Sequence, residues 1–527
     1  MKNKSRTGYS ILNTSVASAS RIITIFLGYV ARIVFTRTLD QHYVGVSGLF
    51  LDFFKLLSLS ELGISIAITY ALYQPIADSD HEKQKSVMHL YRRFYNGVAL
   101  IVLLIGLLVF PFLNSLIKGQ PNVDHLQLIY LLYLSNSVIS FLFVYKKTLI
   151  DAHQQMYISM GYYGLFMTLQ YALQIVLLVC THNFILYLLV HPICTLLHNI
   201  AISRKAEKMF PYLKEKEIQP LSREDKQGIA KNIKAMFMHK VGMLMETTTG
   251  SVVISAFIGV SMLGKYSNYA LIMTSMLSVI KLAFTSLTSI WGHLYAEKSK
   301  DTVRSYCEAG HLLNFWIGTL FFLGYYAIVD NLVAILFSED LMISRSISFV
   351  IALNGFVQYI RENTLVFREA TGTFYNDRWK SLFEALMNVI LSVIFVKRFE
   401  VAGVVVATML TNLLICHVVE PYVLYKHAFA SSPRRYYWKN YGMILLFGAS
   451  LLLLDKCLLS YTSQWKELLV NGCISVAIAA AVSVSVIPFH KEEFRNTINE
   501  HATHFVQSFE DFHFVAKTSE VTCASET

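Results

Sequence analysis

The first long apolar stretch, residues 11–36, decides the fold of this chain: ILNTSVASASRIITIFLGYVARIVFT. It exceeds the roughly 20 residues that a helix needs to cross a bilayer, yet it contains Arg21 and Arg32. A cation in the middle of a membrane costs at least about 2.5 kcal/mol, so such residues usually face a polar interior. The two arginines are separated by about three helical turns and so share nearly one helix face. The stretch predicts a membrane helix with a cationic face.

The composition indicates that most of the chain lies in a membrane. Of 527 residues, 54% are hydrophobic and 15% are charged, with a mean hydropathy of +0.47, whereas soluble domains carry roughly 25% charged residues. Membrane β-barrels are excluded because their strands alternate over about 10 residues. The net charge of +10 fits basic loops beside anionic lipid, so no nucleic-acid partner is expected. Cysteines and histidines lack ligand spacing, so no metal site is expected.

Hydropathy and polar breaks predict an all-α polytopic membrane protein with about 14 transmembrane helices. The predicted spans are 11–36, 44–73, 94–117, 124–145, 157–180, 183–202, 236–262, 266–295, 308–337, 346–367, 381–397, 401–425, 440–458 and 466–488. The loops alternate, and those on one side carry most of the 45 Lys and Arg residues. By the positive-inside rule that side is cytoplasmic, which places both termini in the cytoplasm.

A polar, basic linker at 203–235 divides the chain. The predicted parts are an N-terminal lobe with spans 1–6, this linker, a C-terminal lobe with spans 7–12, two further spans and a cytoplasmic tail: 1–202, 203–235, 236–427, 428–490 and 491–527. A weak repeat supports the two lobes, because GVSGLF at 45–50 follows the first span as GKYSNY at 264–269 follows the seventh. We therefore predict two six-helix lobes in parallel repeat plus two C-terminal helices, which is typical of transporters with a midplane site.

Basic residues inside the spans are the candidate binding residues for an anion. Arg21 is too deep in its helix to reach the headgroups easily, whereas Arg32 lies nearer the outer end and either snorkels or lines a cavity. Lys281 is central in its span, and Arg361 is expected to face the cavity in preference to the adjacent Glu362. Arginine offers a planar fork that matches phosphate oxygens, and lysine offers a point charge. A cavity lined by these cations predicts a phosphate-bearing ligand.

Four further charges inside the spans are candidates for ion coupling or for structure. Asp52 and Lys55 are three residues apart, which suits a local ion pair, and the structural interpretation is preferred. Glu61 is either a protonatable coupling residue or a partner of Arg21, and Glu246 is likewise a coupling or a structural residue. A coupling ion would be H⁺ or Na⁺, and no other cofactor is expected.

The sequence contains no catalytic motif with a suitable context. Residues 259–266, GVSMLGKY, approach a phosphate-binding loop but are one residue short. They place Tyr266 where Ser or Thr should bind magnesium, and they join two membrane helices instead of a strand and a helix. The chain is therefore not expected to be an enzyme, and transport would depend on an ion gradient, the membrane potential or the gradient of the substrate.

Three stretches carry a family resemblance. The first is RIVFTRTL at 32–39, which continues through 43–75. The second is GKYSNY at 264–269, and the third is FREATG at 367–372, followed by Asn388 and Gly403-Val404. Over roughly residues 10–430 the chain resembles the polysaccharide and oligosaccharide-lipid flippases. The branch is that of the sugar translocases, within the multidrug/oligosaccharidyl-lipid/polysaccharide exporter superfamily. The chain departs from the family pattern at Asp40, where Gly is frequent, and at 247–249, which lacks a frequent acid.

The resemblance implies a two-lobed fold whose central cavity opens alternately to each side of the bacterial cytoplasmic (inner) membrane. The cargo would be an oligosaccharide joined through pyrophosphate to a polyprenol, for capsule or lipopolysaccharide assembly. The arginines would hold the pyrophosphate, and glycosyltransferases and a polysaccharide polymerase would be partners. The alternatives are an ion-coupled multidrug exporter of the same superfamily and, from another class, a membrane glycosyltransferase or polymerase, which the short outer loops disfavour.

Overall fold

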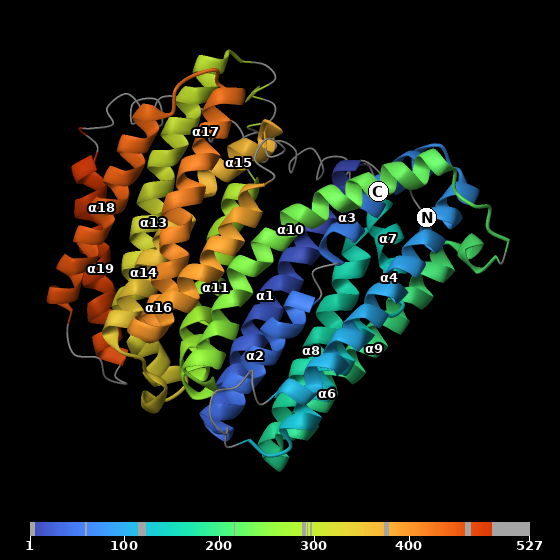
Figure 1. Ribbon diagram of the computed structural model, residues 1–527, viewed down its shortest axis with the longest axis horizontal. Coiled ribbons are helices and arrows are strands. Elements are labelled where there is room, and N and C mark those ends of the chain that lie inside the picture. The colour runs from blue at the N-terminus through green and yellow to red at the C-terminus, as the bar shows by residue number, and fades with distance from the viewer. Residues whose placement is uncertain are drawn as a thin grey trace, which may run out of the picture. The chain divides into compact units, whose positions relative to one another are not determined.

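The computed structural model describes residues 6–57, 61–113, 123–215, 217–286, 291, 294–295, 298–373, 379–458, 465–486 and 488. In this part of the chain every regular element is a helix (Figure 1). Among the described residues, eight helical segments are long and apolar enough to cross a bilayer: Ser15–Thr38, His81–Phe112, Leu126–Ala152, Met156–Thr181, Phe184–Met209, Lys300–Leu336, Arg434–Cys457 and Trp465–Val486. The protein is therefore an all-helical, multi-pass membrane protein. The number of 14 spans stays a prediction, and the tail at 491–527 lies outside the described residues.

The chain forms two compact units. The first comprises Met1–Leu271, Val333–Ile343 and Ser381–Thr408. Its complete helices are α1 (Arg6–Thr38), α2 (Gln41–Leu57), α3 (Glu61–Ala77), α4 (His81–Val109), α6 (Leu126–Phe141), α7 (Lys147–Ala152), α8 (Met156–Thr181), α9 (Phe184–Met209) and α10 (Arg223–Phe257). Helix α11 (Val260–Ser286) starts in this unit and continues in the second. The lobe boundaries predicted from the sequence stay a prediction.

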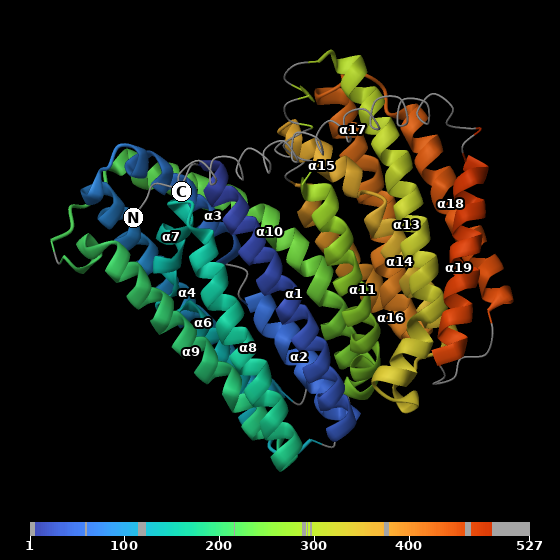
Figure 2. The same cartoon turned by 180° about the vertical axis from the view of Figure 1, so that it is seen from behind.

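Helix α1 lies along α8 in the first unit, as the views from both sides show (Figures 1 and 2). A Cβ atom at Gly164 of α8 would lie 2.6 Å from Ser20 Oγ, and one at Gly28 of α1 would lie 3.3 Å from the Tyr171 hydroxyl. Small residues at such positions allow membrane helices to approach closely. Arg21 follows Ser20 and is therefore turned by about 100° away from this contact.

The basic linker is held against the start of α4. Lys85 is buried, and its Nζ lies 2.5 Å from Glu215 Oε2. Lys83 Nζ lies 3.0 Å from Asp225 Oδ1, and this hydrogen bond lowers the pKa of the Asp225 carboxyl. Ser222 is the N-cap of α10, and its hydroxyl accepts a hydrogen bond from the backbone N–H of Asp225 at 3.0 Å. The linker is therefore attached to α4 at two points, Glu215 and Asp225.

We expect the substitution Lys85→Met to release this part of the linker without unfolding the protein. Glu215 is 58% exposed, so water can solvate its carboxylate once the ammonium is gone. Limited trypsin digestion of the purified protein should then cut after Lys214 several times faster than in the parent. Arg92→Met is the matched control, because Arg92 is an exposed residue of the same helix. Equal cleavage rates in the two variants would contradict a linker clamped by Lys85.

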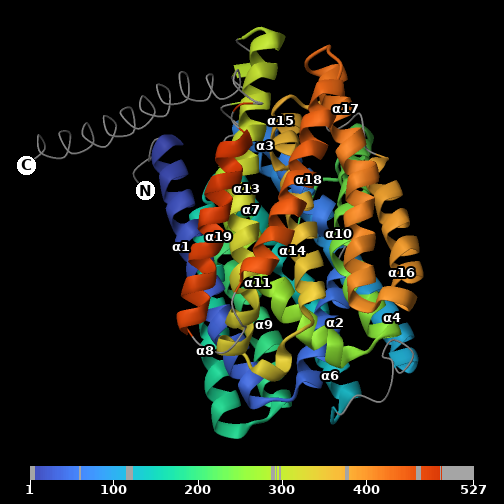
Figure 3. The same cartoon turned by 90° about the vertical axis from the view of Figure 1, so that its left-hand side faces the viewer.

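The second unit comprises Ile272–Leu332, Ser344–Lys380 and Met409–Thr527. Its helices are the later part of α11, most of α13 (Lys300–Leu336), α14 (Arg345–Tyr359), α15 (Glu362–Ala370), α17 (His417–His427), α18 (Arg434–Cys457) and α19 (Trp465–Val486). Figure 3 views the molecule from the side of α18 and α19, which pack against each other. Aromatic rings fill the core, and the rings of Phe356 and Phe447 stack with centroids 3.8 Å apart.

The predicted span 346–367 is not one continuous helix. Helix α14 ends at Tyr359 and α15 begins at Glu362. At this break Asn314, a buried residue of α13, donates from Nδ2 to the carbonyls of Tyr359 (3.4 Å) and Ile360 (2.9 Å). The side chain of Asn314 thus satisfies carbonyl groups that the interrupted helix leaves open, which allows a break at membrane depth.

The segment Lys380–Thr411, α16, reverses direction within its length. Glu400 has a left-handed φ of 51°, and Asn388 Nδ2 donates to Thr408 Oγ1 at 3.0 Å. Those two residues would be about 30 Å apart in a straight helix, so the segment is a helical hairpin. A Cβ atom at Gly403 would lie 2.4 Å from the Phe395 carbonyl oxygen, so only glycine permits this tight approach. The reversal falls between the predicted spans 381–397 and 401–425.

Candidate functional site

Arg32 is held by polar groups of α11 in the first unit. Its Nε donates to Asn268 Oδ1 at 2.9 Å, and its Nη2 donates to Ser267 Oγ at 2.5 Å. One turn earlier, the Tyr29 hydroxyl donates to the Leu271 carbonyl at 3.4 Å. Asn268 is fully buried, and its Nδ2 has no hydrogen-bond partner among the described residues. The guanidinium of Arg32 is therefore directed at α11 in this conformation.

Arg21 is exposed on α1. Neighbouring Ile22 and Phe26 are 67% and 66% exposed, which fits a helix surface that the protein leaves uncovered. Within the described part of the chain no ion pair holds Arg21. Whether this surface lines a cavity stays a prediction.

The acidic candidates of the first unit are placed in part. Asp52 Oδ2 accepts a hydrogen bond from Ser251 Oγ of α10 at 2.5 Å, while Lys55 is exposed. Among the described side chains, Asp52 is thus bonded to another helix and not paired within 4.0 Å with Lys55. Glu61 begins α3 and Glu246 lies in α10, but their side chains lie outside the described residues.

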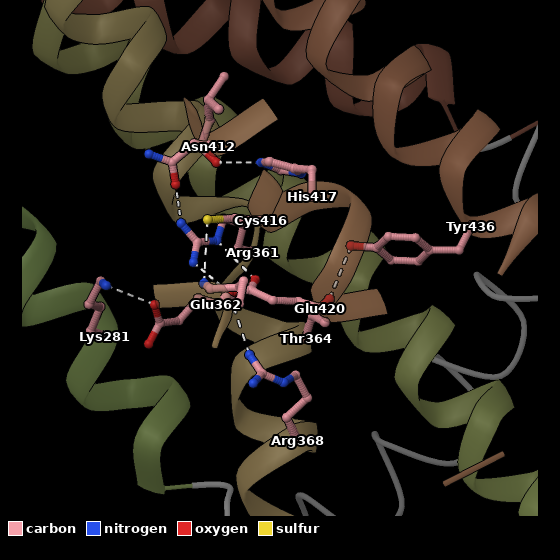
Figure 4. A network of polar contacts seen from close by, with 12 residues as sticks. Lys281, Arg361, Glu362, Thr364, Arg368, Asn412, Cys416, His417, Glu420 and Tyr436 are labelled. Atoms are coloured by element: carbon pink, nitrogen blue, oxygen red, sulfur yellow. Dashed lines mark hydrogen bonds and ion pairs between the residues drawn. The ribbon is translucent and has the colours of Figure 1, made fainter. Parts of the chain in front are cut away.

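In the second unit one buried carboxylate binds three cations (Figure 4). Glu420 of α17 is 1% exposed. The guanidinium of Arg361 forms a bidentate pair with this carboxylate: Nη2 lies 2.6 Å from Oε1, and Nε lies 3.0 Å from Oε2. Lys380 Nζ lies 2.6 Å and Arg368 Nη1 lies 3.5 Å from Oε1. Such bidentate, charge-assisted pairs are the strongest hydrogen bonds of protein interiors.

Backbone irregularities position this cluster. The break between α14 and α15 places Arg361 at its corner. A π-helical turn, Asn412–Cys416, precedes α17, and Asn412 Oδ1 accepts a hydrogen bond from Arg361 Nη1. Single π turns inside helices are frequent at functional sites.

Lys281 joins the same region through Glu362. Its Nζ lies 2.9 Å from Glu362 Oε2, and Lys281 is 41% exposed while Glu362 is 7% exposed (Figure 4). The structure thus brings together two of the predicted site residues, Lys281 and Arg361, because Arg361 and Glu362 are adjacent. Arg21 and Arg32 lie in the other unit.

We define the cationic cluster as the six residues Lys281, Arg361, Glu362, Arg368, Lys380 and Glu420. Four basic side chains share two acidic ones in this cluster. Buried charges are stable only when they are paired, and each basic side chain of this cluster lies at ion-pair distance from a carboxylate oxygen. Lys281 is the member of the cluster that is most accessible from outside, because its side chain is 41% exposed. Among the described residues, no three His, Cys, Asp or Glu side chains are grouped as metal ligands.

The sequence interpretation missed three members of the cationic cluster. Arg368 and Lys380 were assigned to a cytoplasmic loop, because they flank the polar segment at 369–379. Glu420 lies inside the predicted span 401–425 and precedes Pro421. An acid within an apolar span is the signal that could have identified it.

Comparison with known proteins identifies the fold. No family model matches the sequence, and no curated protein matches it. A solved structure described as lipid II flippase MurJ in an inward closed conformation is similar, with a TM-score of 0.66 and 13% identity over 90% of this chain and 99% of that one. An inward-facing MATE family multidrug resistance transporter of the MOP superfamily has a TM-score of 0.59 and 16% identity, over 82% of this chain and 99% of that one.

The outward-facing form of a MATE transporter is also similar, with a TM-score of 0.51 and 16% identity over 83% of this chain and 100% of that one. At such identities the likeness concerns the fold alone. It extends over nearly the whole length of each of these transporters. The resemblance predicted from the sequence is confirmed at this level: the chain has the fold of the transporters of the MOP superfamily.

Proposed function

We propose that this protein is a flippase that moves polyprenyl-pyrophosphate-linked oligosaccharide repeat units across the cytoplasmic membrane for surface polysaccharide assembly. The observation that carries the proposal is the cationic cluster, in which four basic side chains share two carboxylates inside a membrane protein. A pyrophosphate attached to a lipid would bind at the exposed side of Lys281, and the lipid tail would remain in the bilayer while the sugar crosses.

The proposed roles follow the accessibility of each cation. Arg21 is exposed, and the side chain of Lys281 is 41% exposed. These two residues would contact the pyrophosphate first. Arg361 is paired with Glu420 and would stabilise the site by its positive charge. Arg32 would be a further contact of the pyrophosphate. The lipid-linked cargo is consistent with the likeness to a structure that is named a lipid II flippase.

The proposal includes a topology of 14 spans in two six-helix lobes plus two helices, with both termini in the cytoplasm, and alternating access to a central cavity. Asp52, Glu61 and Glu246 would be the residues at which H⁺ or Na⁺ couples to transport, with Lys55 tuning Asp52. Glycosyltransferases and a polymerase would supply and consume the cargo on opposite sides of the membrane.

The test follows the sidedness of the lipid-linked oligosaccharide in cells that depend on this protein. On depletion, the oligosaccharide should accumulate in the cytoplasmic leaflet. The double substitution Arg21→Gln with Lys281→Gln should lower the surface polysaccharide by roughly tenfold or more, because two phosphate contacts are each expected to contribute at least about 1 kcal/mol. Arg398→Gln is the control, since Arg398 is an exposed arginine near the predicted outer loop. Unchanged polysaccharide in the double variant would overturn the proposal.

The likeness to MATE transporters supports one other candidate, a cation-coupled multidrug exporter. That function predicts acids as the dominant groups at the ligand, in contrast to the cationic cluster. Export of cationic dyes from whole cells, at a rate that the double substitution above leaves unchanged, would favour it. Transfer of sugar by the purified protein would instead point to a glycosyltransferase or polymerase.

A further inference from the structure

Helices α2 and α11 cross with their backbones in contact, and both contact segments belong to the first unit. A Cβ atom at Gly45 would lie 1.7 Å from the Val260 carbonyl oxygen. One at Gly264 would lie 2.6 Å from the Gln41 carbonyl oxygen and 3.1 Å from the Gly45 nitrogen. No side chain fits at either position, so the two glycines set the distance between these helices.

The crossing joins equivalent positions of the internal repeat. Gly45 and Gly264 begin the two repeated hexapeptides, and Gly48 corresponds in the same way to Ser267. A Cβ atom at Gly48 would lie 3.9 Å from Ser267 Cβ. Small residues at both pairs of positions, Gly45 with Gly264 and Gly48 with Ser267, therefore allow the first turns of α2 and α11 to lie directly against each other.

Arg32 fastens this crossing from α1. Its guanidinium donates to Asn268 and to Ser267, the residue that faces Gly48. The buried Nδ2 of Asn268 has no hydrogen-bond partner among the described residues. A buried donor without a partner is costly, so the amide is satisfied only when another group or water reaches it. Its environment is therefore suited to a rearrangement.

The place of the crossing in the topology suggests its role. In the predicted topology, the α1–α2 and α10–α11 connections, at 39–40 and 258–259, lie on the side with few basic residues, which is the outer side. The crossing thus lies at the outer ends of α2 and α11. A contact there blocks the outward path, and it must part if cargo leaves on that side.

We propose that the crossing of α2 and α11 is the outer closure of the transport path and that Arg32 is its latch. When the helices separate, the hydrogen bonds of Arg32 to Asn268 and Ser267 break, and its guanidinium becomes able to bind the anionic group of the cargo. The latch is a positioning residue in the closed state and a ligand contact in the open state. This inference rests on the proposed function for the nature of the cargo, but the closure itself does not depend on it.

A reversible cross-link tests the closure. The pair Gly48→Cys and Ser267→Cys, in a chain whose native cysteines are replaced by serine, has the Cβ separation of a disulfide, for which about 3.5–4.5 Å is required. Oxidation should form the disulfide in membranes and abolish transport, and a reductant should restore it. The control pair, Val16→Cys and Gly161→Cys, joins α1 to α8, where a Cβ atom at Gly161 would lie 3.9 Å from Val16 Cγ1, and its oxidation should leave transport intact.

Asn268→Leu tests the latch. This variant removes one of the two acceptors of Arg32, while its volume keeps the helix interface filled. The other acceptor, Ser267 Oγ, is already absent from the cysteine pair. The Gly48–Ser267 disulfide should then form several times more slowly, and Arg32→Lys, which keeps the charge but loses the fork, should slow it similarly. An unchanged rate in both variants would overturn the role of Arg32.

The outcomes separate the two proposals. If the oxidised cysteine pair transports at the rate of the reduced pair, the closure is wrong while the flippase proposal stands. If the unmodified protein moves no lipid-linked oligosaccharide, the flippase proposal fails, and the cross-linking rates of the variants still decide the closure.

Discussion

The substitution Glu420→Gln is expected to remove most of the folded protein from the membrane. Glu420 is the shared counter-ion of Arg361, Arg368 and Lys380, all largely buried. Leaving buried charges without their partner costs about 3–5 kcal/mol, which is a large share of the roughly 5–15 kcal/mol that stabilises a typical folded protein. The amount of monodisperse protein after detergent extraction, and its melting temperature, are the measurements.

Glu362→Gln is the matched control for this prediction. It also removes one carboxylate from the cationic cluster, but its partner Lys281 is 41% exposed and remains accessible to water. Water can solvate the Lys281 ammonium when its partner is neutral, so the loss is smaller than for a cation that stays fully buried, and this variant should fold nearly normally. Equal stability of both variants would mean that Glu420 does not hold α15 and α17 together.

The second large effect is expected from a single methyl group at the helix crossing. Gly45→Ala places a Cβ atom 1.7 Å from the Val260 carbonyl oxygen, a backbone atom that no rotamer change can move. The helices must separate, and overpacking of this kind costs about 1–3 kcal/mol. We expect transport to fall by tenfold or more and the disulfide between positions 48 and 267 to form far more slowly.

Gly48→Ala, one turn along the same helix, is the control for the methyl group itself. The added Cβ meets Ser267 Cβ at 3.9 Å, an ordinary contact, and alanine favours a helix over glycine by about 0.5–1 kcal/mol. This variant should transport at the parent rate and should not melt earlier. Similar losses at positions 45 and 48 would show that the backbone contact is not the cause.

Much of the helical framework could be predicted from the sequence because long apolar runs leave the backbone no other way to satisfy its polar groups in lipid. The reversal at Glu400 was also expected, since Lys397 and Arg398 interrupt the apolar pattern there. The break before Glu362 was not expected, because Asn314 provides the compensating hydrogen bonds from another helix.

The candidate site was predicted less completely, for a physical reason. Helical spacing places Arg21 and Arg32 on one face, but it does not say which helix that face meets, and Arg32 turned out to face α11. Glu420 is 59 residues from Arg361 along the chain, so no local spacing could pair them. The repeat identified Gly45 and Gly264 as equivalents, but only the three-dimensional structure shows that they contact each other.

The position of Glu420 has a consequence for the unloaded protein. If the cargo carries the proposed phosphate, the Glu420 carboxylate takes its place in the unloaded protein, since it binds Arg361, Arg368 and Lys380. A carrier with a resident counter-charge can return empty without drawing a free anion into the bilayer. In the proposed transport cycle, such a residue would prevent futile anion leakage on each return step.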